Sequence, residues 1–304
     1  MSAEAADRSA VAQVATIDFH VTAECSQECP YCWGPQGFEE PVDTNTALAI
    51  IRRIRTVGAR RIVFTGGDPL QRPDVGELIH GARAVGLEVA LSTTGDRLDS
   101  EFLEANAGCL DLVSLPLDGS TEEVSCRTKE PGHYAAVMGA LELLRAYPAI
   151  DVKVCTPVTR HNLADVPYIL RLVEMYAETT AARVFYNVFQ AFPRTMQEVE
   201  WEDLLVSAEE FAALRRELAK RRRVRVNWLD HETLDRLYVM VFPDGSLVVP
   251  QGTEYRSYGP FLDIVDLDDV LARSAFDSAR HLAHSRGWSK NPELPVADRR
   301  ARRG

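Results

Sequence analysis

The sequence has few cysteines and fewer basic than acidic residues, and it contains no long hydrophobic run. No stretch approaches the roughly twenty apolar residues that cross a bilayer, and the polar N-terminus is unlike a secretory signal. With 34 basic and 45 acidic residues the net charge is −11, which disfavours nucleic acid and anionic lipid as partners. Six cysteines in 304 residues are too few for a secreted disulfide framework. These absences predict a cytoplasmic protein with no membrane and no nucleic-acid partner.

The apolar content is high enough for a continuous core, since 46% of the residues are hydrophobic. Short β-branched or apolar runs alternate with longer stretches of helical spacing, which is typical of repeated βα units around a parallel sheet. The six predicted strands are 16–22, 61–65, 88–92, 112–117, 151–156 and 183–187. The six predicted helices are 44–57, 73–85, 99–106, 133–147, 165–176 and 208–222.

The pattern changes after the sixth unit. Two short apolar runs, 237–242 and 247–250, flank the turn sequence Pro243-Asp244-Gly245 and predict a hairpin, and helical segments follow it. The sequence therefore predicts an α/β fold, a partial (β/α)6 TIM-like barrel with a C-terminal capping extension. The predicted organisation is a flexible tail over 1–15, a core over 16–226 and a cap over 227–304.

Half of the cysteines fall within eight residues. Cys25, Cys29 and Cys32 have the spacing CxxxCxxC in the loop after the first predicted strand. Three thiolates this close can hold one face of an iron–sulfur cubane, whereas structural zinc normally requires a fourth ligand, and the sequence shows no obvious one. The spacing predicts a 4Fe-4S cluster in which one iron keeps an open coordination position.

In two places the chain resembles the radical S-adenosylmethionine (radical SAM) superfamily. Tyr31 precedes the last cysteine of the cluster, as an aromatic residue does in the family's cluster motif. The segment Thr65-Gly66-Gly67-Asp68 follows the second predicted strand and is similar to the family's GGEP motif, which receives the amino group of the methionine moiety. Aspartate here replaces the family's glutamate, and the two glycines allow close approach of the backbone.

Two further segments extend the resemblance to about residues 16–190. Residues 92–95, STTG, resemble the polar segment after the family's third strand, and residues 114–119, SLPLDG, resemble the segment after its fourth. All of these motifs follow the C-terminal ends of predicted strands. Parallel α/β barrels carry their active sites at this rim, so the motifs are expected to meet there.

The resemblance implies that the three cysteines hold a 4Fe-4S cluster, which binds S-adenosylmethionine at its open iron. An electron from an external reductant of the flavodoxin or ferredoxin type would cleave the sulfonium bond and give a 5′-deoxyadenosyl radical, which takes hydrogen from the substrate. The residues implied in binding S-adenosylmethionine are Tyr31, Gly66, Gly67, Asp68, Ser92, Thr94, Ser114 and Arg127. A guanidinium makes a paired contact with a carboxylate, which favours Arg127 for this group, but an exposed arginine in a charged loop explains it equally well.

Contacts with the substrate are expected from residues around and after the sixth strand, namely Tyr186, Asn187, Gln190 and Arg194. Arg194 is a candidate anchor for a carboxylate or phosphate, and Cys155 is a candidate hydrogen donor if it points inward. A small buried apolar role is the simpler interpretation of Cys155. His281 and His284 are spaced like a helical metal pair, although a polar helix face explains them better.

The sequence favours a radical SAM enzyme that acts on a small biosynthetic intermediate, such as a sugar, a nucleoside or an amino-acid derivative. No cysteine follows Cys155, so the cysteine-rich auxiliary-cluster domain of many peptide-modifying members is not expected. Redox-neutral chemistry then fits better than dehydrogenation: rearrangement, elimination, decarboxylation or carbon–carbon bond formation. Two alternatives stay open, namely a peptide-modifying radical SAM enzyme and a non-catalytic protein that binds metal or senses redox state.

Overall fold

The computed structural model describes residues 14–35, 40–194, 199–219 and 224–290. A run of parallel strands forms most of its sheet. These strands are β1 (Thr16–His20), β2 (Arg61–Thr65), β3 (Glu88–Ser92), β4 (Leu112–Pro116), β5 (Asp151–Val158), β6 (Val184–Gln190) and β7 (Arg225–Leu229). Each pairs in parallel with the next along the chain, as the βα pattern predicts.

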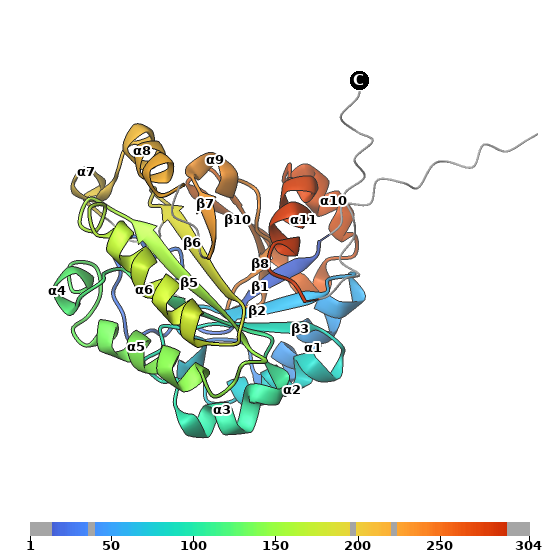
Figure 1. Ribbon diagram of the computed structural model, residues 1–304. Coiled ribbons are helices and arrows are strands. Elements are labelled where there is room, and N and C mark those ends of the chain that lie inside the picture. The colour runs from blue at the N-terminus through green and yellow to red at the C-terminus, as the bar shows by residue number, and fades with distance from the viewer. Residues whose placement is uncertain (1–13, 36–39, 195–198, 220–223, 291–304) are drawn as a thin grey trace, which may run out of the picture.

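Helices connect these strands and pack along the outer side of the sheet (Figure 1). They are α1 (Thr44–Thr56), α2 (Val75–Ala84), α3 (Ser100–Asn106), α4 (Glu122–Ser125), α5 (His133–Leu144), α6 (Val166–Thr179), α7 (Trp201–Leu204) and α8 (Ala208–Leu218). The six predicted helices correspond to six of these, and the predicted end of the last at 220–222 lies outside the described residues. Among the described helices, none has the length and apolar character of a membrane span.

The barrel strands alternate between two environments. Ile17 and Phe19 of β1 are fully buried in the core formed with the helices, whereas Thr16, Asp18 and His20 face the interior of the barrel. This is the period of two that a strand imposes on its side chains. The side chains of β1 that point outward are apolar and stabilise the fold. The side chains of β1 that point inward are polar and do not contribute to the hydrophobic core.

The parallel sheet continues one strand further than the sequence predicts. β7 pairs with β6, with Asn227 opposite Asn187. The prediction missed β7 because this strand follows a basic run that looks like a helix end, and its residues are mostly half-buried or exposed.

The predicted hairpin is present, and it joins the same sheet. β8 (Met240–Val241) pairs in parallel with β1 and antiparallel with β9 (Ser246–Gln251), which pairs antiparallel with β10 (Glu254–Pro260). The strand order is therefore β10-β9-β8-β1-β2-β3-β4-β5-β6-β7. The C-terminal extension thus adds an antiparallel section to the edge of the sheet beside β1.

Two helices follow, α10 (Leu267–Arg273) and α11 (Ser278–Arg286). α11 lies against the first residues of the strands, since Nε2 of His281 accepts the N–H groups of Ala15 and Thr16 at 3.0 and 3.2 Å, and Arg61 donates to the Ser285 carbonyl at 3.1 Å. This helix closes the base of the barrel, opposite the rim. Ala15, assigned by the sequence to a flexible tail, is buried there, and residues 1–13 of that tail lie outside the described residues.

Candidate functional site

The cysteine loop follows β1 at the rim of the barrel. Cys29 is buried, Cys32 is half-buried and Cys25 is exposed. All three thiols line one cavity of about 250 Å³, called here the cysteine cavity, together with Tyr31 and residues of the next strand ends. Within the described parts of the chain, no three His, Cys, Asp or Glu side chains converge to hold a single metal ion. A cubane instead binds each thiolate at a different iron, so three thiols around one cavity are a donor set that fits it.

Gly66 and Gly67 let the loop after β2 pass directly against the cysteine loop. Gly66 has a φ of +148°, and a Cβ there would lie 2.2 Å from the Thr22 carbonyl oxygen, while a Cβ on Gly67 would lie 2.1 Å from that of Glu24. The same loops are joined by backbone hydrogen bonds, from Gly67 to Thr22 at 2.9 Å and from Asp68 to Glu24 at 2.7 Å. The glycines are therefore required by the position of the cysteine loop itself.

Asp68 organises the rim from behind the cavity. Its buried carboxylate accepts hydrogen bonds from the hydroxyls of Thr93 and Thr94 at 2.7 and 2.6 Å, and from the N–H of Leu70 at 3.1 Å. The sequence expected Asp68 to contact the cofactor, but the side chains that reach the cavity are the two threonines. The sequence did not predict Thr93 as a site residue, because its place at the cavity depends on the buried hydrogen bond to Asp68.

Arg127 does not reach the cysteine cavity. Its exposed guanidinium donates to the His161 carbonyl at 3.1 Å and to Glu123 at 3.5 Å on the outer surface. The cation at the cavity is Lys129, which the sequence did not single out. Its buried Nζ donates to Sγ of Cys29 at 3.0 Å. The turn after α4 points the first cation outward and the second inward.

Lys129 belongs to a buried polar network beneath the thiols. The Tyr31 hydroxyl and the Thr128 hydroxyl both donate to Oδ2 of Asp118, the latter at 2.9 Å. Burial lowers the pKa of Lys129, but the nearby charges of Asp118 and Cys29 outweigh this effect and its pKa is raised. The network therefore keeps an ammonium group beside the sulfur of Cys29.

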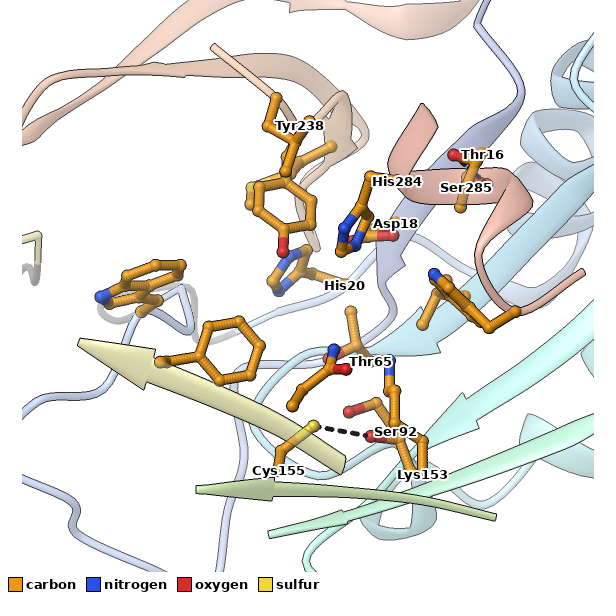
Figure 2. A pocket seen from close by; sticks show the side chains of 18 of the residues that line it. Thr16, Asp18, His20, Thr65, Ser92, Lys153, Cys155, Tyr238, His284 and Ser285 are labelled. Atoms are coloured by element: carbon orange, nitrogen blue, oxygen red, sulfur yellow. Dashed lines mark hydrogen bonds between the residues drawn. The ribbon is translucent and has the colours of Figure 1, made fainter. Parts of the chain in front are cut away.

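A second cavity of about 250 Å³, called here the barrel chamber, occupies the interior below the rim (Figure 2). Its side walls are the inward residues of β1 to β6, and its base is α11 with Trp288. The residues that line both cavities are Trp33, Thr65, Ser92, Cys155 and Phe189. The two cavities therefore adjoin across a shared wall, with the thiols on one side and the barrel interior on the other.

The predicted cofactor-binding residues divide between the two cavities. Tyr31, Gly67 and Thr94 line the cysteine cavity, Gly66 and Ser114 line the barrel chamber, and Ser92 lines both. Only Asp68 and Arg127 of that predicted set line neither one.

The predicted substrate residues are more scattered. Asn187 faces the barrel chamber and accepts a hydrogen bond from Asn227 at 2.7 Å, and Gln190 faces the cysteine cavity. Tyr186 does not line either cavity, so the structure does not bring it to the predicted substrate site. It belongs to the outward phase of β6, where its hydroxyl donates to Thr156 at 3.0 Å within the core.

Arg194 is fully buried but lines neither cavity. Its Nε donates to the Gly252 carbonyl at 2.9 Å, and its guanidinium carbon lies 5.0 Å from the ring centre of Trp33 and 4.7 Å from that of Phe192. Burial lowers its pKa. In this structure it connects the β9–β10 turn to the cysteine loop rather than projecting into solvent.

Cys155 points inward, as its proposed donor role requires. It stands in the wall between the two cavities, with Sγ 3.4 Å from Oγ of Ser114 (Figure 2). His281 and His284 lie on a polar face of α11, as the sequence predicts, and this face is directed toward the barrel interior. His281 uses both ring nitrogens structurally, since Nδ1 also bonds the Leu237 carbonyl at 2.9 Å.

Comparison with known proteins agrees with this geometry. The sequence profile of the Radical SAM superfamily matches residues 19–173. Mycofactocin maturase MftC of Mycobacterium ulcerans (strain Agy99) is 30% identical over 202 residues, covering 65% of this chain and 53% of the maturase. An S-adenosylmethionine-dependent nucleotide dehydratase of Flammeovirga pacifica is 26% identical over 269 residues, covering 83% of this chain and 88% of the dehydratase. The chain thus spans about half the length of the first relative and most of the second.

Among solved structures, Streptococcus suis SuiB bound to the precursor peptide SuiA superposes with a TM-score of 0.65 at 11% identity, covering 92% of this chain and 68% of SuiB. At this identity the likeness concerns the fold alone. The predicted fold class, a partial α/β barrel with a C-terminal extension, is confirmed.

Proposed function

This chain belongs to the radical SAM superfamily, and from that premise we propose that it acts on a small molecule by redox-neutral radical chemistry. Enzymes of this family use a 4Fe-4S cluster and S-adenosylmethionine, so the chain is an enzyme and the non-catalytic alternative is wrong. We assign the cluster to Cys25, Cys29 and Cys32, which share one cavity. The expected setting is the reducing cytoplasm, with an external one-electron donor.

The cysteine cavity supplies the groups that a bound S-adenosylmethionine needs. When bound, the cluster and this cofactor together supply a 5′-deoxyadenosyl radical that abstracts hydrogen from the substrate. The hydroxyls of Thr93 and Thr94 are oriented by Asp68, and Gly67 presents bare backbone at the wall. Among the described residues that line this cavity, Lys129 is the only cation, and we assign it to the carboxylate end of the cofactor.

The observation that carries the small-molecule proposal is the barrel chamber. It adjoins the cysteine cavity, has a volume of about 250 Å³, and is closed at its base by α11 and Trp288. A reactive radical needs a substrate held close to it, and a chamber that adjoins the cysteine cavity can hold one there. Its lining is mostly apolar and aromatic, and it also carries polar groups, among them the oppositely charged Asp18 and Lys153.

The redox-neutral part of the proposal rests on one relative. The nucleotide dehydratase supports it, since that relative matches this chain over most of both lengths and its name describes an elimination on a small molecule. Peptide modification is the second candidate, favoured by the fold shared with SuiB, whose solved complex holds a precursor peptide.

The proposal is tested on the anaerobically reconstituted chain with dithionite and S-adenosylmethionine. We expect about four irons and four sulfides per chain, as a cubane contains, and release of methionine and 5′-deoxyadenosine. Cys29→Ser should abolish both the cluster and the cleavage. The matched control is Cys126→Ser, at an exposed thiol that does not line either cavity, and it should retain both. A wild-type chain that never releases 5′-deoxyadenosine would overturn the assignment.

A further inference from the structure

His20 is a buried polar side chain for which the fold supplies no use. It is 6% exposed, and within the described residues neither ring nitrogen has a hydrogen-bond partner. Its ring contacts Phe242, with centres 5.2 Å apart, so a leucine or phenylalanine would pack there at no such cost. An unsatisfied buried polar group destabilises the folded chain, so the geometry points to a ligand as the partner of His20.

Other polar side chains face the same space and make no side-chain hydrogen bond within the described residues, although the rings of Tyr238 and His284 contact each other edge to face. Asp18 is two residues away on the same face of β1, and Tyr238 and His284 approach from the C-terminal extension (Figure 2). Burial lowers the pKa of His20 to about 3, so its imidazole is neutral and offers one donor and one acceptor. Hydroxyl groups, which both donate and accept, are the natural complement of such a set.

The charges of the chamber limit what it can hold. Asp18 and Lys153 are its two oppositely charged groups, and Lys153 lies 4.2 Å from the ring centre of Trp288. The neighbouring Arg61 is already paired with Glu88 at 3.0 Å. A triphosphate carries several negative charges and would face a carboxylate with one ammonium group as compensation. The chamber therefore disfavours polyanions.

The aromatic walls favour a ring. Trp33 and Phe189 stand edge to face, with ring centres 6.2 Å apart, at the boundary with the cysteine cavity. A ring placed against these two aromatic side chains would occupy the same cavity as His20 and Asp18.

We propose that the barrel chamber binds a polyhydroxylated ring compound without a polyphosphate, a nucleoside or a free sugar, through hydrogen bonds to His20 and Asp18. This deepens the proposed function, because it names the substrate class of the chamber on which that function rests. His20 then has a ligand as its hydrogen-bond partner. Without the ligand its imidazole is unsatisfied, which lowers the stability of the free protein.

The test measures binding to the full chain, first without a cluster and then with cluster and S-adenosylmethionine. The probes are cytidine, glucose and cytidine triphosphate, and calorimetry measures the binding of each one. We expect either cytidine or glucose to bind, and which of the two binds tells a nucleoside site from a sugar site. Cytidine triphosphate should bind at least tenfold more weakly than cytidine. Tighter binding of the triphosphate, or no binding of either neutral probe, overturns the proposal. None of these outcomes depends on cleavage of S-adenosylmethionine, so a failure of the proposed function is recognised separately.

Two variants locate the site. His20→Leu should weaken binding of the active probe at least tenfold and raise the melting temperature of the free chain, since it removes an unsatisfied polar group. The control, His161→Leu, makes the same change at an exposed histidine and should leave the affinity within twofold. Unchanged affinity in His20→Leu, or a lowered melting temperature with affinity retained, would show that His20 is structural.

Discussion

The two cavities share a wall but differ in how individual buried polar groups are satisfied. Around the cysteine cavity, Asp68 is bonded to two threonines and Lys129 to Cys29. In the barrel chamber, His20 has no partner among the described residues. Groups that are held by one another before a ligand arrives are preorganised, which suits a cofactor that is always the same. A buried group without a partner in the free protein is what the proposed recognition of substrate by the chamber requires.

The largest effect among the substitutions is expected from Gly67→Val, at the wall of the cysteine cavity. Its side chain would collide with the backbone of Glu24, so the cysteine loop is displaced and the cluster should fail to assemble, with loss of its visible absorbance. The matched control is Gly139→Ala, where a Cβ meets nothing within 4 Å. A full cluster with reduced affinity for S-adenosylmethionine would mean that Gly67 contacts the cofactor without shaping the loop.

The next largest effect distinguishes Lys129 from Arg127, two cations that lie two residues apart in the sequence, by their influence on the affinity for S-adenosylmethionine. Lys129→Met removes the ammonium group beside Cys29 and should weaken binding of S-adenosylmethionine at least tenfold, measured by calorimetry on the reconstituted enzyme. Arg127→Met removes an exposed guanidinium and should change the affinity by less than twofold. If Arg127→Met proved the more damaging, the loop after α4 would have to turn when the cofactor binds.

Acid should destabilise the chamber end of the molecule. Burial lowers the pKa of His20, His281 and His284 from 6.5 to about 3, 4 and 3, so below pH 6.5 the unfolded chain takes up protons that the folded chain does not. Each histidine then costs about 1.4 kcal/mol of unfolding free energy per pH unit.

Asp18 acts in the opposite direction, because burial raises its pKa to about 6 and the folded chain binds its proton more tightly between pH 6 and 4. Its contribution to the unfolding free energy offsets that of about one histidine, so the unfolding free energy falls by about 2.7 kcal/mol per pH unit between pH 6 and 4. Urea denaturation from pH 7 to pH 4.5 measures this slope. A flat profile would mean that the three histidines are solvated.

The smallest effect concerns Tyr186 and its neighbour. Tyr186→Phe removes the hydrogen bond to Thr156 and should lower the unfolding free energy by about 0.5–1.5 kcal/mol, with turnover unchanged. Asn187→Ala, on the inward phase of β6, should affect turnover more than stability. A turnover defect in Tyr186→Phe would revive the contact with substrate that the sequence predicted.

Short-range patterns made much of this protein predictable. The cysteine spacing, the glycines after β2 and the alternation of strands and helices are each readable within a few residues, and they specified the parallel barrel and most of the rim. The alternation on β1 was readable too. Asp18 and His20 occupy the phase opposite to Ile17 and Phe19, and two such polar residues in a buried strand indicate an interior site.

By itself, then, the sequence determined the family, the order of the βα units and the three thiols, because these depend on spacing along the chain and on strand and helix periods. Only the tertiary structure decided that Lys129 and not Arg127 faces the thiols, that Tyr186 faces the core, and that α11 closes the barrel beneath β1. The direction of a side chain in a turn depends on contacts between segments far apart in the chain. The pairing of α11 with residues some 266 positions earlier is likewise fixed by packing that no local pattern encodes.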